Sequence, residues 1–294
     1  MAEHTSFCSF KSRNHPLFRS GSGEFVFRFP RFQINEKENQ FFLAVLWFDK
    51  IEDKTIVWSA NGEKLAPQGS KLTQNSSSAL VLNGPDGHML WKALPSYDSK
   101  SSCVAIIDNG NLVILDDHHN SIWESLENPT DTILPGQTLH MDTRLRSCQS
   151  PKNYSEGRFQ LSLLLDGNLV LYSMSNQIHV KAYFATMTMN WASQLIFTEA
   201  GYMFINGGNN LIQNLTMKDP GPKESFYHMA RIDYDGIFRL YNHPIREDTT
   251  GCGSCSSLWS EVQRIPDDIC GKGLCGPNSI CNITDNGMAF CTST

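Results

Sequence analysis

The chain of 294 residues has little charge, and the charge that it has is not basic. Charged residues make up 18% of the sequence, and 30 Asp and Glu residues outnumber 24 Lys and Arg residues. No basic stripe is present, and this argues against nucleic acid as a partner. The longest clean apolar run covers only residues 41–48, whereas a bilayer-spanning helix needs about 20 apolar residues. No segment of this chain is therefore expected to cross a membrane.

Catalytic motifs are also scarce. Residues 21–23 resemble the start of a kinase glycine loop, but Val26 stands where the third glycine belongs. No His-Arg-Asp or Asp-Phe-Gly motif follows, so the groups needed for phosphoryl transfer are missing. His118 and His119 beside Asp116 and Asp117 could bind a metal, but a solvated loop explains them better. We predict no catalytic residue, no cofactor and no metal site.

The nine cysteines and the glycosylation sequons indicate an oxidising compartment. Six cysteines crowd the C-terminal region, a density typical of a disulfide-stapled secreted module: Cys252, Cys255, Cys270, Cys275, Cys281 and Cys291. Four Asn-X-Ser/Thr sequons predict N-glycosylation: Asn75, Asn153, Asn214 and Asn282. Residues 1–20 are polar and lack the apolar core of a signal peptide. We expect an extracellular protein whose leader is missing, with Cys8 as the unpaired cysteine.

A metal is the alternative explanation for the C-terminal cysteines. The Cys252-x2-Cys255 pair followed by Cys270-x4-Cys275 is loosely similar to a zinc ribbon. The second spacing does not match the usual ligand pair, and the sequons favour disulfides.

Three short segments ending in tryptophan recur at almost constant spacing in the first half of the chain. Trp58, Trp91 and Trp123 lie 33 and 32 residues apart, and a strand-like run precedes each one. Self-similarity at a fixed period is the mark of a repeated structural unit. The sequence predicts a three-fold all-β module whose indole rings meet in one core.

Asx-Gly pairs separate the apolar runs throughout the chain, and such pairs are strong hairpin signals. No long helical periodicity is present, so the spacing of strands and turns predicts an all-β fold. A second module begins after residues 135–137. Residues 163–172 and 231–241 in it share an Asp-Gly pair followed by Tyr, which indicates a drifted relative of the first module.

The sharpest candidate site consists of Asp166, Asn168, Val170 and Tyr172. These are alternate residues, and alternate side chains of an extended strand share one face. An acceptor, an amide, an apolar contact and a phenol at about 7 Å intervals suit the hydroxyls of a sugar. The alternative is an ordinary hairpin, since Asp-Gly-Asn is good turn sequence.

This face resembles the mannose-binding motif of the bulb-type lectins. Residues 123–137 are similar to the end of the lectin domain in plant G-type (S-domain) lectin receptor-like kinases. Residues 23–27 and 55–61 also resemble that family's opening strands, and residues 270–281 resemble its EGF-like segment. The resemblance covers residues 18–294. It implies two tandem bulb-lectin-like β-prism modules with pseudo-three-fold symmetry, followed by a truncated EGF-like segment.

The resemblance also implies boundaries, bonds and partners. We expect an N-terminal tail over 1–20, a bulb-type lectin domain over 21–139, a second S-locus glycoprotein-like domain over 140–260 and a partial EGF-like segment over 261–294. In the EGF-like pattern Cys270 pairs with Cys281, and Cys275 with Cys291. The expected partner is a mannose-type glycan or another cell-surface ligand, perceived in defence or pollen recognition. Membrane attachment and kinase activity would need a missing downstream segment.

Departures from the motif leave two alternatives. Leu164 stands where the motif has Gln, and the first module's face keeps only Asn109, Asn111 and Val113. One alternative is a degenerate lectin scaffold that serves protein recognition or homodimerisation. The other is a fragment of a receptor serine/threonine kinase whose catalytic domain is absent from this chain.

Overall fold

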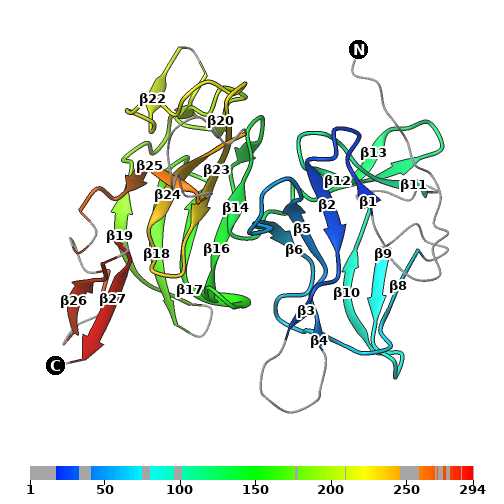
Figure 1. Cartoon of the computed structure of the whole chain (residues 1–294). Coiled ribbons are helices and arrows are strands. Elements are labelled where there is room, and N and C mark those ends of the chain that lie inside the picture. Colours follow the sequence, from blue (N-terminus) through cyan, green and yellow to red (C-terminus); the bar gives the residue numbers. More distant parts are fainter. Residues whose placement is uncertain are drawn as a thin grey trace, which may run out of the picture. The chain divides into compact units, whose positions relative to one another are not determined.

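The computed structural model describes residues 18–32, 41–74, 80–95, 101–175, 178–208, 210–245, 258–268, 270, 274–275, 279–285 and 287–293. All regular elements in these residues are β-strands, numbered β1 to β27 (Figure 1). The prediction of an all-β fold is therefore confirmed. The chain divides into two compact units, residues 1–128 and residues 129–294.

The first unit is built from antiparallel sheets around one core. One sheet contains β1 (Phe18–Arg19), β2 (Phe25–Arg28), β5 (Val45–Phe48) and β6 (Ile56–Ser59). Two further sheets contain β8 (Lys71–Gln74), β9 (Leu80–Asn83) and β10 (Met89–Ala93), and β11 (Ser101–Ile106), β12 (Leu112–Asp116) and β13 (Ser121–Glu124). Three short strands form a small fourth sheet: β3 (Arg31–Phe32), β4 (Phe41–Phe42) and β7 (Ala66–Pro67).

The three repeated tryptophans meet in the core of this unit. Their ring centroids lie 5.7 Å (Trp58–Trp91), 5.9 Å (Trp58–Trp123) and 5.9 Å (Trp91–Trp123) apart, all edge to face. Edge-to-face contact is favourable because the positive ring edge meets the negative ring face. One tryptophan comes from each of the three larger sheets, on β6, β10 and β13. The predicted three-fold indole core is confirmed.

The second unit contains three four-stranded sheets. The first sheet pairs, in order, β14 (Thr132–Ile133), β23 (Phe226–Ile232), β24 (Phe238–Pro244) and β25 (Ser260–Ile265). The second sheet pairs β15 (Thr138–His140), β20 (Gln194–Phe197), β21 (Met203–Asn206) and β22 (Ile212–Asn214). The third sheet pairs β16 (Thr143–Ser150), β17 (Asn153–Leu163), β18 (Leu169–Ser175) and β19 (Ile178–Ala185). Each sheet contributes to one apolar core, which includes Leu161, Leu195 and Leu240. The second unit thus repeats the three-sheet plan with an aliphatic core.

The division between the units lies earlier than the boundary at 139/140 that the sequence suggested. Strands β14 and β15 precede that boundary, yet they pair with β23 and β20 of the second unit. The start of the EGF-like segment at 261 also differs, because β25 continues through Ile265 in the sheet of β24. Both differences arise from strand pairings between residues far apart in the sequence.

A recurrent hairpin turn joins neighbouring strands in four of the sheets. A glycine N–H donates to the carbonyl three residues earlier at Gly110, Gly167, Gly201 and Gly236. These glycines have φ between 84° and 87°, in the left-handed region that favours glycine. At Gly167 an added Cβ would lie 2.1 Å from the carbonyl oxygen of Ala192, so no larger residue fits there.

The last described hairpin, β26 (Ser279–Ile283) and β27 (Ala289–Ser293), carries two disulfides. Cys270 is bonded to Cys281, and Cys275 to Cys291, as the EGF-like resemblance implied. These bonds remove both cysteines of the suggested Cys270-x4-Cys275 pair as zinc ligands. Cys8, Cys252 and Cys255 lie outside the described residues.

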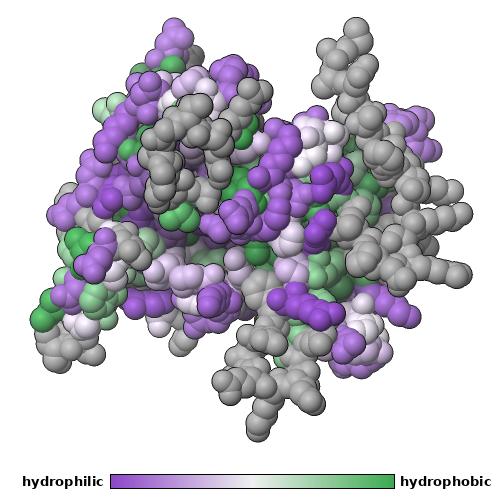
Figure 2. All heavy atoms as spheres, viewed as in Figure 1, coloured by the Kyte–Doolittle hydropathy of each residue, from purple (hydrophilic) through white to green (hydrophobic). Residues whose placement is uncertain are grey.

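The surface visible in Figure 2 is mostly hydrophilic, and its apolar areas are small and separate. The β26–β27 hairpin presents apolar side chains to solvent, with Ile280, Ile283 and Phe290 exposed. Within the described part of the chain, no helix has the length and apolar character that a membrane crossing requires.

Asp49, which follows β5, gives the first unit a measurable pH dependence. Burial works to raise its pKa, but the Trp47 indole hydrogen bond and the cations of Arg19, Lys54 and Arg28 outweigh burial and lower it below 3.8. A carboxylate with a lowered folded-state pKa stabilises the fold above its unfolded-state pKa and loses that contribution as the pH falls through the folded value. Urea unfolding should show Asp49→Asn less stable than the parent by about 1 kcal/mol near neutral pH. The difference should shrink below pH 3.8, and a constant difference would contradict this account.

Candidate functional site

The candidate residues lie on one face of the sheet β16–β19. Leu161, Leu163, Leu169 and Leu171 point into the core of the second unit. The alternate residues Gln160, Ser162, Val170 and Tyr172 therefore point to the opposite side, which we call the polar face. Gln160 lies directly opposite Tyr172, and Ser162 lies opposite Val170.

Asp166 and Asn168 belong to the turn that leads into this face. Strand β18 begins only at Leu169, so the prediction of four residues on one extended strand holds for Val170 and Tyr172 alone. Asp166 is exposed, and its Oδ1 accepts a hydrogen bond of 2.9 Å from the backbone N–H of Asn168. Its Oδ2 has no hydrogen bond within the described residues and is left for a ligand or solvent.

Asn168 is buried, with 7% of its surface exposed, and this corrects the expectation of an exposed side chain. Its Oδ1 accepts 3.3 Å hydrogen bonds from the Thr186 hydroxyl and from the backbone N–H of Thr188. The threonines lie after β19, so the asparagine ties the turn to the next segment. Its Nδ2 group has no partner among the described residues and can still donate to a ligand. A substitution here would disturb the fold as well as binding.

Tyr172 is held by an aromatic contact. Its ring stacks on His179, with centroids 4.1 Å apart and an angle of 4° between the planes. Burial raises the pKa of Tyr172, and the nearby Asp166 carboxylate raises it further. The phenol therefore remains a neutral donor and acceptor at physiological pH, which suits hydrogen bonding to a hydroxyl.

A chain of hydrogen bonds fixes the polar side chains that surround Tyr172. Arg146 Nη1 donates to Gln160 Oε1 over 3.3 Å, and this contact sets the orientation of the amide. Gln160 Nε2 then donates to Ser162 Oγ over 2.7 Å and meets His179 Nε2 at 2.9 Å. Because the amide nitrogen is a donor, His179 Nε2 must accept, which places the imidazole proton on Nδ1.

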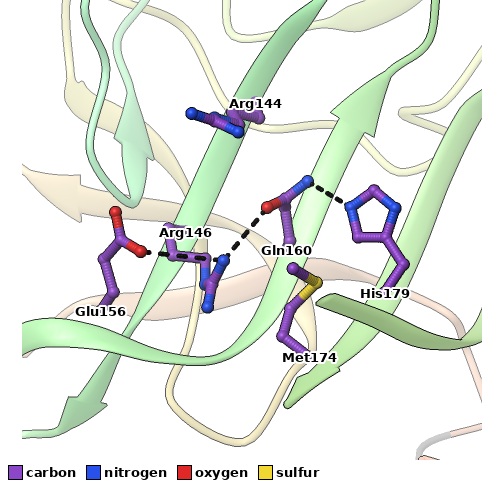
Figure 3. A pocket seen from close by; sticks show the side chains of 6 residues that line it. All are labelled: Arg144, Arg146, Glu156, Gln160, Met174 and His179. Atoms are coloured by element: carbon purple, nitrogen blue, oxygen red, sulfur yellow. Dashed lines mark hydrogen bonds and ion pairs between the residues drawn. The ribbon is translucent and has the colours of Figure 1, made fainter. Parts of the chain in front are cut away.

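A pocket of about 260 Å³ opens on this face, as Figure 3 shows. Its lining residues come from four adjacent strands: Arg144, Arg146, Glu156, Gln160, Met174 and His179. Arg146 lies between the Glu156 carboxylate and the Gln160 amide, whereas Arg144 stands apart with no marked contact (Figure 3). The pocket therefore combines two guanidinium groups with one carboxylate.

The corresponding face of the first unit uses its polar groups internally. Asn111 is 3% exposed, and its Oδ1 accepts from the Ser125 hydroxyl while its Nδ2 donates to Glu124 Oε2. Asn109 caps the turn by accepting from the N–H of Asn111. Val113 packs with other apolar side chains of the same sheet. This degenerate face offers a sugar few free polar groups.

The equivalent positions on β23–β24 form an ion network. Arg239, 1% exposed, donates to Asp233, Asp235 and Glu261 at 2.8–3.0 Å. Asp235 Oδ2 also accepts from the backbone N–H of Ala289 over 2.9 Å, and Arg239 donates to the carbonyl of Gly287 over 3.2 Å. The repeat of residues 231–241 therefore fastens the disulfide-bonded hairpin to the second unit.

The sequons remain predicted glycosylation sites. Asn153 and Asn214 are exposed and Asn282 is partly exposed, while Asn75 lies outside the described residues. Cys103 and Cys148 form no disulfide. Burial and the neighbouring Asp131 carboxylate raise the pKa of the Cys148 thiol, so it remains protonated and unreactive.

Sequence reasoning missed the residues contributed by the neighbouring strands. Gln160 and Ser162 alternate with apolar residues in β17, and this pattern signals one polar face. No local signal indicates that Arg144 and Arg146 join that face, because strand register brings them there.

The comparisons with known proteins agree with this architecture. Residues 55–153 match the family described as D-mannose binding lectin. The match does not include residues 166–172. Among solved structures, a mannose-specific agglutinin from snowdrop (Galanthus nivalis) is 20% identical, covers 42% of this chain and 99% of its own, and gives a TM-score of 0.30. A monomeric mannose-binding lectin from Gastrodia elata is 19% identical, with 42% and 99% coverage and a TM-score of 0.29.

Longer relatives extend the match to most of the chain. A G-type lectin S-receptor-like serine/threonine-protein kinase of Oryza sativa subsp. indica, LECRK3, is 33% identical over 90% of this chain and 34% of its own length. The corresponding kinase RLK1 of Arabidopsis thaliana is 33% identical over 93% of this chain and 34% of its own. Residues 55–153 are thus similar to a bulb-type lectin domain, and most of the chain is similar to part of the G-type lectin S-receptor-like kinases. The chain spans about a third of the length of these relatives.

Proposed function

We propose that this chain is an extracellular recognition module that binds a mannose-type sugar at Asp166, Asn168, Val170 and Tyr172. One observation carries the proposal: Asp166 Oδ2 and Asn168 Nδ2 are free at the edge of a face that continues through Val170 and Tyr172. An acceptor, a donor, an apolar contact and a phenol can together contact adjacent hydroxyls of one sugar. The lectin-family match in the same chain supports this choice of ligand class.

The receptor context is part of the same proposal. The relatives named above are kinases by name, and this chain corresponds to about a third of their length. We infer that it perceives a glycan at the outer cell surface, while any phosphoryl transfer belongs to other parts of such a protein. The two disulfides support an oxidising, extracellular environment.

Asp166→Ala is the variant that tests sugar binding most cleanly. It removes the free carboxylate oxygen and one turn hydrogen bond, which costs about 0.5–1.5 kcal/mol of stability. Binding to a multivalent mannose surface, measured by glycan array with oxidised, secreted protein, should fall to background. Multivalent display is needed because a single shallow site binds weakly.

Asp86→Ala is the matched control for that variant. Asp86 is also exposed, and its Oδ1 accepts from the N–H of the residue two positions later, His88, over 3.1 Å. Asp86 has the same role in its turn but does not belong to the polar face, so the array signal of Asp86→Ala should equal that of the parent. Equal mannose binding by the parent and Asp166→Ala would reject the site. A blank array with folded parent protein would favour the alternative of a lectin scaffold that recognises proteins.

A further inference from the structure

The pocket of Figure 3 is a continuation of the polar face of the sheet β16–β19. Arg146, Gln160 and Tyr172 lie directly opposite one another on three adjacent strands. His179 stacks on Tyr172 and also lines the pocket. Two strand spacings separate Arg146 from Tyr172, a span of about 10 Å. That distance places the Arg146 side of the pocket about one sugar residue beyond a sugar bound at Tyr172.

The pocket has an excess of positive charge. Arg146 is fixed by the Gly157 carbonyl at 3.0 Å and Gln160 Oε1 at 3.3 Å, and the Glu156 carboxylate lies 3.7 Å from its Nη1. Glu156 is half exposed, so water weakens this ion pair. Arg144 is exposed and forms no hydrogen bond or ion pair with the described residues. One guanidinium is therefore free for an anion, and a second stands beside it.

Size and geometry narrow the class of ligand. A volume of about 260 Å³ lies just below the range of about 300–1,000 Å³ for drug-sized ligands, which suits one sugar residue. A planar guanidinium binds a carboxylate through two parallel N–H···O bonds. The His179 imidazole lies beside the arginines, while the Gln160 amide is held by Arg146, Ser162 and His179.

We propose that this pocket is a subsite for the carboxylate of a uronic acid, so that the ligand of the polar face is an acidic glycan. The proposal rests on the proposed function, because the neutral part of the glycan would occupy the face at Asp166 and Tyr172. Arg144 supplies the charge-assisted hydrogen bonds to the carboxylate, and the Arg146 guanidinium adds a second positive charge that attracts it.

The test compares two disaccharides that differ only in this group, 1,4-linked mannobiose and the same disaccharide with one mannose replaced by mannuronate. Isothermal titration measures both against the parent, Arg144→Met and Lys152→Met. Lys152 is an exposed cation in the turn between β16 and β17 that does not line the pocket. Arg144→Met spares the fold because Arg144 has no partner within the described residues to lose.

We expect the parent and Lys152→Met to bind the mannuronate-containing disaccharide about tenfold or more tightly than mannobiose, because a hydrogen-bonded charge pair adds that much affinity. Arg144→Met should bind both disaccharides equally. Equal binding of both by the parent would overturn the subsite and leave the proposed function standing. Absence of binding to either disaccharide would overturn the subsite, and a multivalent mannose array that is also blank would overturn the proposed function as well. Inorganic sulfate binding at Arg144 without a preference for the mannuronate-containing disaccharide would reduce the pocket to an unspecific anion site and overturn the inference.

Discussion

Replacement of Arg239 by methionine should destabilise the second unit by about 3–5 kcal/mol, the usual loss when one partner of a buried charge network is removed. The guanidinium is 1% exposed, and the Asp235 carboxylate that it contacts is completely buried. Burial raises the pKa of Asp233, the second carboxylate of the network, although the Arg239 and Arg231 cations oppose that rise. Without Arg239 the Asp235 carboxylate would remain buried without its cation, whereas Asp233 would keep Arg231 and the Tyr241 hydroxyl. Chemical unfolding of the secreted protein measures the loss.

Two further variants separate charge from packing. Arg264→Met removes a partly exposed arginine whose ion pair with Glu261 lies near the surface, and it should cost less than about 1 kcal/mol. The double variant Arg239→Met with Asp235→Asn should recover part of the loss, since it removes the uncompensated carboxylate. A loss in Arg239→Met no larger than in Arg264→Met would contradict this account of the network.

The same variant should loosen the disulfide-bonded hairpin. Asp235 accepts from the N–H of Ala289 and Arg239 donates to the carbonyl of Gly287, so the network joins the hairpin to β24. Hydrogen exchange should therefore accelerate in residues 287–292 of Arg239→Met and remain unchanged in Arg264→Met. The hairpin itself keeps its antiparallel strand pairing, and the disulfides join its two strands to the preceding Cys270 and Cys275.

Replacement of Trp58 by alanine should have a comparable effect on the first unit, a loss of about 3–5 kcal/mol. The indole contacts Trp91 and Trp123, and its Nε1 donates to the Asn128 carbonyl over 2.8 Å. Alanine leaves a cavity between the other two rings, because one ring from each sheet fills the centre.

Trp58→Phe serves as the matched control. Phenylalanine keeps an aromatic ring in the cluster but removes the hydrogen bond to Asn128, so its loss should be clearly smaller than that of alanine. Unfolding followed by the fluorescence of the remaining tryptophans compares the two variants. Equal unfolding midpoints for the parent and Trp58→Ala would show that the indole cluster does not stabilise the first unit.

Local patterns were sufficient to predict most of the fold. The spacing of Trp58, Trp91 and Trp123 predicted the three-fold core because one ring per repeat must reach the same centre. Asp166-Gly167 predicted a hairpin, since only glycine fits the left-handed turn position. These features depend on neighbours in the sequence, and sequence reasoning handles them well.

Features that depend on distant pairing could not be predicted in this way. The unit boundary differs from the expected one because β14 and β15 pair with strands about 100 and 60 residues later. Asn168 was expected to be exposed because the alternation of strand side chains was extended into a turn, where it does not apply. The pocket depends on strand register, which places Arg146 opposite Gln160 and Tyr172.

A crystal structure of the secreted protein with a bound mannoside tests the central claim most directly. Our account predicts the sugar within hydrogen-bonding distance of Asp166 Oδ2 and Asn168 Nδ2, with its ring against Val170 and Tyr172. A sugar bound instead at the Asn109–Val113 face of the first unit, or at any site away from Asp166, would contradict it.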